Sequence, residues 1–198
     1  MRMLALIRSE SPNFFSSESP MLPMIRLRGI ILGLSVLSLA ACQVGAPNLG
    51  ASVSRAGFKA SYLVARVALE KGQFARAERG YASLLKRAGP LEPRIRLEYA
   101  HALLRAEKFE HASDEARVVA AQLDGPGRSA ALAVQATADQ EIARAAINRG
   151  VADSDAVQRL VAARSGFDEL LKNHPELDPL GAMALRRETI DVELSTIN

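Results

Sequence analysis

Sharp glycine and proline breaks divide residues 55–198 into pieces of roughly 13 to 22 residues, which is close to ordinary helix length. Ala, Leu, Arg, Glu and Gln dominate these pieces, and none alternates apolar with polar residues as a half-buried strand does. Glycine after one helix and proline at the start of the next are typical helix ends. The pattern predicts an all-α domain with breaks at Gly72, Gly89-Pro90, Glu107-Lys108, Gly125-Pro126-Gly127, Gly150 and His174-Pro175.

The helical pieces also repeat along the chain. Four residues, Ala65, Phe74, Ala77 and Tyr81, are matched 35 positions later by Ala100, Phe109, Ala112 and Ala116. A period between about 20 and 50 residues is typical of repeat architectures in which each unit packs on the next. The matches therefore predict a stack of similar helical units.

The segments ARVALEKGQFARAERGYASLL (65–85) and AHALLRAEKFEHASDEARVVA (100–120) resemble the tetratricopeptide repeat (TPR), a helix-turn-helix unit of about 34 residues. The resemblance implies that Ala65 and Ala100 lie where the first helix of a hairpin meets the second. It places Phe74 and Phe109 at the turn, and it implies that the two helices approach closely at Ala77 and Ala112.

On this resemblance the fold is an all-α, TPR-like right-handed solenoid of about three antiparallel helical hairpins. The repeats would span residues 58–92 and 93–127, followed by a divergent unit at 128–177 and a capping helix at 178–198, which covers the last hairpin. Ala163, Phe167 and Leu170 mark the second helix of the divergent unit, and Asp153, Ser154 and Asp155 could cap its start.

The sequence departs from the family pattern at two kinds of position. Ser61 and Arg96 stand where the family has tryptophan or leucine, and Gly89 and Asp124 stand at its closing proline. An Ala-rich helical bundle without repeat symmetry is the alternative fold.

Residues 24–42, MIRLRGIILGLSVLSLAAC, have the layout of a secretory signal: two arginines, an apolar run and small residues at the exit. The quartet Leu39-Ala40-Ala41-Cys42 resembles the lipobox of bacterial lipoproteins, which implies a signal peptide at 24–41 and lipidation of Cys42. Two alternatives stay open. One is a membrane-spanning helix, although the apolar run is shorter than the roughly 20 residues that such a helix needs. The other is that Cys42 is a buried structural thiol, since a free cysteine packs as a small apolar residue.

Residues 1–23 have no helical or strand period and are expected to be disordered or to precede the true start at Met24. Residues 42–54 read as the lipidated cysteine and a flexible tether, so the folded domain is expected at 55–198. Without residues 1–41 the chain holds 21 basic and 20 acidic residues, so its net charge is near +1. That balance does not favour nucleic acid as a partner.

The sequence contains no pattern that points to catalysis. Cys42 is the only cysteine, so a lipid on its sulfur would exclude disulfides and thiolate chemistry. His101, His111 and His174 lack the spacing of a metal site, and no P-loop, dinucleotide fingerprint or nucleophile elbow is present. We therefore predict no catalytic residues, no metal and no cofactor.

One polar stripe stands out on the predicted first helices of the two clear repeats. At 100° per residue, Arg94, His101 and Arg105 share one helix face. The matching face one repeat earlier is formed by Lys59, Tyr62, Arg66 and Glu70. In TPR proteins these faces line a concave groove that holds a peptide or a helix. The resemblance thus implies a ligand groove lined by Lys59, Tyr62, Arg66, Arg94, Leu97, His101 and Arg105, and its cations would suit carboxylates. Solvated arginines without a ligand are the alternative.

Small TPR lipoproteins of this form resemble accessory lipoproteins of pilus assembly and envelope adaptors. The resemblance implies a lipid-anchored periplasmic scaffold that binds a protein or peptide, and the cations of the groove would suit an acidic one. Gln43 follows the cysteine, where an aspartate would favour retention in the inner membrane, so the outer membrane is the expected location. An envelope enzyme acting on peptidoglycan and a purely structural assembly subunit remain the alternatives.

Overall fold

The computed structural model describes residues 49–197, and it describes side-chain surroundings from residue 55 onwards. Within this range all regular structure is helical. The seven α-helices are α1 (Leu49–Glu70), α2 (Phe74–Leu85), α3 (Glu92–Arg105), α4 (Phe109–Gln122), α5 (Gly125–Asn148), α6 (Ser154–Asn173) and α7 (Ala182–Ile197). Short 3₁₀ turns at Gly89–Leu91 and Pro175–Leu177 precede α3 and α7. The all-α prediction is confirmed, and the predicted breaks at Gly72, Gly89-Pro90, Glu107-Lys108, Gly150 and His174-Pro175 lie between α-helices. Gly125-Pro126-Gly127 instead forms the first turn of α5, and the break falls at Leu123 and Asp124.

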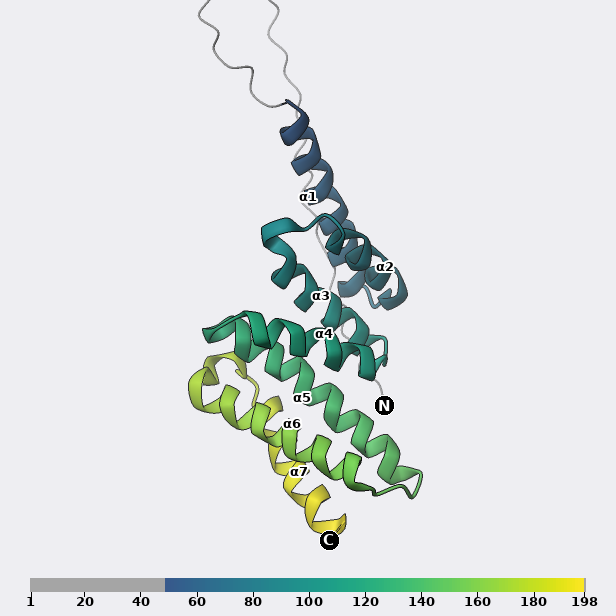
Figure 1. Cartoon of the computed structure of the whole chain (residues 1–198), viewed down its shortest axis with the longest axis vertical. Helices are drawn as coiled ribbons and strands as arrows, with labels where there is room; N and C mark the ends of the chain where they lie inside the picture. The colour runs from purple at the N-terminus through teal and green to yellow at the C-terminus, as the bar shows by residue number, and fades with distance from the viewer. Residues whose placement is uncertain (1–48, 198) are drawn as a thin grey trace, which may run out of the picture. The chain divides into compact units, whose positions relative to one another are not determined.

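Each helix packs on its neighbours in the chain, and the helices follow one another from α1 at one end to α7 at the other (Figure 1). Beyond these neighbour contacts, α3 also packs on α5, and α5 on α7. The described helices are thus arranged as a stack in chain order.

The α1–α2 turn and the α3–α4 turn share the same backbone geometry, 35 residues apart. Gly72 adopts a left-handed φ of 71°, and Glu107, at the equivalent position, adopts 59°. The next backbone N–H reaches back in both turns: Gln73 N donates to Ala68 O at 2.8 Å, and Lys108 N donates to Leu103 O at 3.0 Å. This is the bond pattern of a Schellman C-cap. The sequence period is therefore also a structural period.

The small residues of the repeat lie in the helix interfaces, as expected. Ala65, Ala77, Ala100 and Ala112 are all buried. A Cβ placed on Gly80 of α2 would lie only 2.8 Å from the Cβ of Ala65 on α1. Helices α1 and α2 therefore approach each other too closely at Gly80 for a larger side chain, which would push them apart.

The third unit begins with α5, the longest described helix, followed by a short loop and α6. Among the three candidate caps, Asp153 caps α6: its Oδ1 accepts a hydrogen bond from Ala156 N at 3.0 Å. Phe167 is fully buried, and Ile190 of α7 covers the same cluster. Phe167, predicted on the second helix of the third unit, thus lies in the core, and α7 packs against the same cluster.

Two boundaries differ from the prediction. Helix α1 begins at Leu49, so residues 49–54, expected to belong to a flexible tether, are helical. Helix α7 begins at Ala182, four residues after the predicted start of the capping helix at 178, and Leu180 is exposed in the turn before it. The carboxylate of Asp178 explains this later start, because it accepts hydrogen bonds from Met183 N and Ala184 N at 3.0 Å. Residues 1–48, with Cys42, lie outside the described residues.

Candidate functional site

A hollow of about 270 Å³ lies between α1 and the start of α3. Its lining brings together Lys59, Tyr62 and Arg94, which the sequence placed on one groove. The remaining lining residues, which the sequence analysis did not assign to the groove, are Arg55, Phe58, Leu91 and Ile95. Its lining surface is mainly apolar, although three of its seven lining residues are basic.

The three cations of this hollow are not neutralised by the protein. Arg55, Lys59 and Arg94 are exposed, and none makes an ion pair with another described residue. No acidic residue lines the hollow. Arg87 adds a fourth cation nearby, with its guanidinium 5.9 Å from the ring centroid of Phe58. The hollow therefore combines a mainly apolar lining surface with an excess of positive charge.

Arg66, a further cation of the predicted groove, has a different role. Its guanidinium bonds Glu70 at 2.8 Å and Glu98 at 3.0 Å, and the hydrogen bond to Glu70, with the charge of Glu98, raises its pKa. Glu98 also accepts hydrogen bonds from the hydroxyls of Tyr62 at 3.3 Å and Tyr81 at 3.5 Å. Glu98 thus connects α1, α2 and α3, and the charge of Arg66 is already balanced.

Glu98 was not among the predicted groove residues, although it lies on the same stripe. It stands four residues after Arg94 and three before His101, so the same helical phase that predicted the stripe also placed this carboxylate on it. Because of Glu98, the predicted groove consists of two parts that differ in charge. Its end near Arg94 is cationic, and its middle is neutralised by Glu98.

The three remaining predicted residues lie further along α3. Arg105 stacks on Phe74, with 5.0 Å between the guanidinium carbon and the ring centroid. His101 is exposed, yet crowding by protein atoms lowers its pKa, Arg66 and Arg105 lower it further, and Glu98 opposes them. This lowered pKa favours the neutral imidazole over the cation.

Leu97 does not belong to the groove. It is half-buried and packs against two apolar clusters, one with Val119 and Leu132 and one with Ala116 and Val134. These residues come from α4 and α5, so Leu97 faces the next unit of the stack. Leu97 lies at the edge of the predicted stripe on α3, and its side chain packs toward α4 and α5 rather than into the groove.

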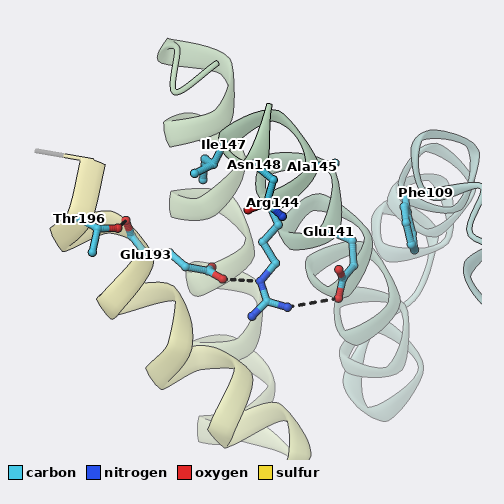
Figure 2. A pocket seen from close by; sticks show the side chains of 8 residues that line it. All are labelled: Phe109, Glu141, Arg144, Ala145, Ile147, Asn148, Glu193 and Thr196. Carbon is cyan, nitrogen blue, oxygen red and sulfur yellow. Dashed lines mark hydrogen bonds and ion pairs between the residues drawn. The ribbon is translucent and has the colours of Figure 1, made fainter. Parts of the chain in front are cut away.

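A second hollow, of about 380 Å³, lies among α4, α5 and α7 (Figure 2). Arg144 stands at its centre and forms ion pairs with Glu193 of α7 and Glu141 of α5. Arg186 also bonds Glu141, at 2.9 Å, and Gln140 donates to Glu193 at 3.2 Å. Because these groups satisfy one another, a polar ligand here would have to displace existing bonds. The hollow at α1 and α3 is the better binding site.

A buried carboxylate beside a hollow is the feature that would favour an enzyme, and Asp139 of α5 comes closest to it. It lines a third hollow, of about 240 Å³, and burial raises its pKa. Its Oδ1, however, already accepts hydrogen bonds from Ser113 at 2.8 Å and from Arg159 at 3.0 Å. Both bonds lower the pKa and oppose the effect of burial. Asp139 is thus an acceptor that joins α4, α5 and α6.

Residues 49–197 contain no cluster of three His, Cys, Asp or Glu side chains that could hold a metal ion. In the same part of the chain, no helix has both the length and the apolar character needed to cross a bilayer. Comparison with protein-family models, curated proteins and solved structures finds no match to this chain.

Proposed function

We propose that this protein is a lipid-anchored adaptor of the bacterial cell envelope that binds an acidic segment of a partner protein. The fold behind this proposal is a TPR-like right-handed solenoid, in which α1, α3, α5 and α7 are the first helices of successive units. The observation that carries the proposal is the hollow between α1 and α3, with its mainly apolar lining surface and its three uncompensated cations.

The chemistry of the hollow defines the segment that it would accept. Arg55 and Arg94 can each hold a carboxylate through two parallel hydrogen bonds, and Lys59 adds a third donor group. Phe58, Leu91 and Ile95 would cover an apolar side chain next to that carboxylate. The best ligand is therefore a segment with apolar and acidic residues close together.

The anchor follows from the sequence of residues 39–42 and is part of the same proposal. A lipid on Cys42 would leave seven residues to the start of α1 at Leu49, which can span at most about 25 Å. The adaptor would then work close to the membrane surface. The residue after the cysteine, Gln43, favours the outer membrane, where accessory lipoproteins of pilus assembly and envelope adaptors act.

Charge reversal tests the groove. The probe is a fluorescent peptide of alternating leucine and glutamate, and a leucine-lysine peptide of equal length is its control. The full chain should bind the acidic peptide, and its affinity should fall with salt, since the Debye length shrinks from ~10 Å at 0.1 M to ~3 Å at 1 M. The double variant Lys59→Glu, Arg94→Glu should lose this binding, because both side chains line the hollow.

The matched control reverses two exposed cations outside the hollow, Arg79 and Arg149, with the same change in net charge. Arg128 and Arg144 would be poor controls because both form ion pairs that their reversal would break. Each double variant should keep its melting temperature, since exposed substitutions usually change stability by only about 0.5 kcal/mol. Equal loss of binding in both double variants would mean that attraction is diffuse and that the hollow is not the site.

A further inference from the structure

The two ends of the helical stack carry exposed apolar side chains. On α1, Leu63, Val64 and Val67 are 50%, 52% and 43% exposed. On α7, Leu185 and Val192 are 64% and 63% exposed. Helices α1 and α7 are the first and last described helices and lie at opposite ends of the stack (Figure 1). Exposed apolar patches at defined places commonly mark protein contacts.

Leu63, Val64, Val67 and Ala68 of α1 line a shallow hollow of about 270 Å³ together with Lys71 and Gln73 of the following turn and Arg76 of α2. We call this surface the α1 end face. It lies on a different side of α1 from the hollow that holds Lys59 and Tyr62. Two cations stand in it, and no acidic residue does. Lys71 makes no ion pair with a described residue, and Arg76 bonds only the neutral Gln73, at 3.4 Å.

The outer face of α7, which we call the α7 end face, has the opposite charge. Leu185, Glu188 and Val192 are three and four residues apart, so they lie on one side of the helix. All three are exposed, and Glu188 makes no ion pair with a described residue. The basic side chains of α7 are already used: Arg186 bonds Glu141 of α5, and Arg187 bonds Asp168 of α6. An apolar, acidic, apolar stripe is left.

We infer that the α1 end face of one copy binds the α7 end face of a second copy. Leu185 and Val192 would cover the hollow at Leu63, Val64 and Val67, and Glu188 would meet Lys71 or Arg76. The second copy is the occupant favoured by the structure, because this chain itself presents the complementary stripe. The two surfaces differ, so the contact is heterologous, and repetition would join copies head to tail into a row. This contact does not use the groove residues of the proposed adaptor site.

Copy-to-copy capture tests the contact. The full chain is expressed with two different affinity tags, extracted in mild detergent, and one tag is used to capture the other. The wild-type chain should capture itself. Val64→Lys, which blocks the α1 end face, and Leu185→Lys, which blocks the α7 end face, should each lose self-capture, since each places a charge in an apolar contact. Both sites are more than half exposed, so the variants should fold normally.

The decisive sample is the mixture of the two variants. Val64→Lys keeps an intact α7 end face, and Leu185→Lys keeps an intact α1 end face. In the mixture these two faces should bind each other, so capture should be restored, but only as a pair of one copy of each variant. Val118→Lys and Val161→Lys change exposed valines elsewhere, on α4 and α6, and should capture like the wild type. They also control for two copies that share one detergent micelle, because such capture would be equal in every variant.

The remaining outcomes overturn the inference. A wild-type chain that never captures itself would show that the end faces bind other proteins. Self-capture by Leu185→Lys at the wild-type level would point to a symmetric contact between two α1 end faces. Two variants that both lose capture and fail to restore it when mixed would show that the faces do not bind each other.

Discussion

At the scale of single residues, the least expected feature is the buried carboxylate of Asp139. Burial in the interior of a helical stack disfavours its charged form, and Ser113 and Arg159 offset part of that cost by donating hydrogen bonds. The pKa of Asp139 in the folded chain is nevertheless raised. The folded chain therefore holds this proton more tightly than the unfolded chain does.

We predict that this residue leaves a signature in the pH dependence of stability. Below the ordinary pKa of 3.8 the carboxyl is protonated in both states. As pH rises above that value, the unfolded chain loses its proton first, so the wild-type free energy of unfolding falls until the raised pKa is passed. Asp139→Asn lacks this fall, so its stability relative to the wild type should increase over the same pH range. Urea unfolding from acidic to neutral pH measures the difference.

The matched control for that experiment is Asp114→Asn on α4, whose carboxylate is 64% exposed and pairs with Arg117 at the surface. The stability of Asp114→Asn relative to the wild type should not rise over the same pH range.

At neutral pH, Asp139→Ala should in addition lower the free energy of unfolding by ~1 to 3 kcal/mol, because it leaves the buried hydroxyl of Ser113 without its acceptor. A parallel pH dependence for Asp139→Asn and the wild type would contradict the raised pKa.

Individual site residues were only partly predictable from the sequence. Helical phase was enough to put Lys59, Tyr62 and Arg94 on one surface, because phase depends only on position in the helix. It could not show that Glu98 neutralises Arg66, since that contact joins residues of two helices. It also placed Leu97 in the groove, where the packing of α5 overrides the phase.

At the scale of helices, the turns were predictable even where the residue type was unhelpful. The backbone of Glu107 lies in the left-handed region, which residues other than Gly, Asn and Asp rarely adopt. Its position 35 residues after Gly72 marked the turn all the same. The start of α1 was not predictable in this way, because the Gly, Ser and Asn of residues 43–54 are typical of a tether, while the structure continues the helix back to Leu49.

The close approach of α1 and α2 gives a prediction at this scale. Gly80→Ala should destabilise the chain by about 1 to 3 kcal/mol, although alanine is the better helix former, because the new methyl group would lie 2.8 Å from Ala65. Thermal unfolding measures the effect. The control is Gly57→Ala on α1, where the new methyl group meets nothing within 4 Å, so it should stabilise by up to about 1 kcal/mol. If both variants were stabilised equally, α2 would have room to move away from α1.

At the scale of the whole chain, the uneven distribution of charge is the feature that connects both proposed contacts. The segment from Arg55 to Arg96 contains ten basic residues and only three acidic ones, and the remainder of the chain is net acidic. The structure distributes the excess positive charge over two separate surfaces, the hollow beside Arg94 and the α1 end face. The sequence indicated the sign of each end, and only the packing of the helices could show which cations remain unpaired.

The last prediction concerns where the whole chain is held in the cell. If Cys42 receives the lipid, labelled palmitate should enter the wild-type chain in growing bacteria, and Cys42→Ser should lose the label and accumulate with its signal uncleaved. The assignment is unambiguous because Cys42 is the only cysteine. Ser38→Ala changes the apolar run just before the final quartet and should still be labelled and cleaved, so it controls for general damage to export. Equal labelling of the wild type and Cys42→Ser would exclude the anchor and leave a chain whose binding surfaces act without a lipid.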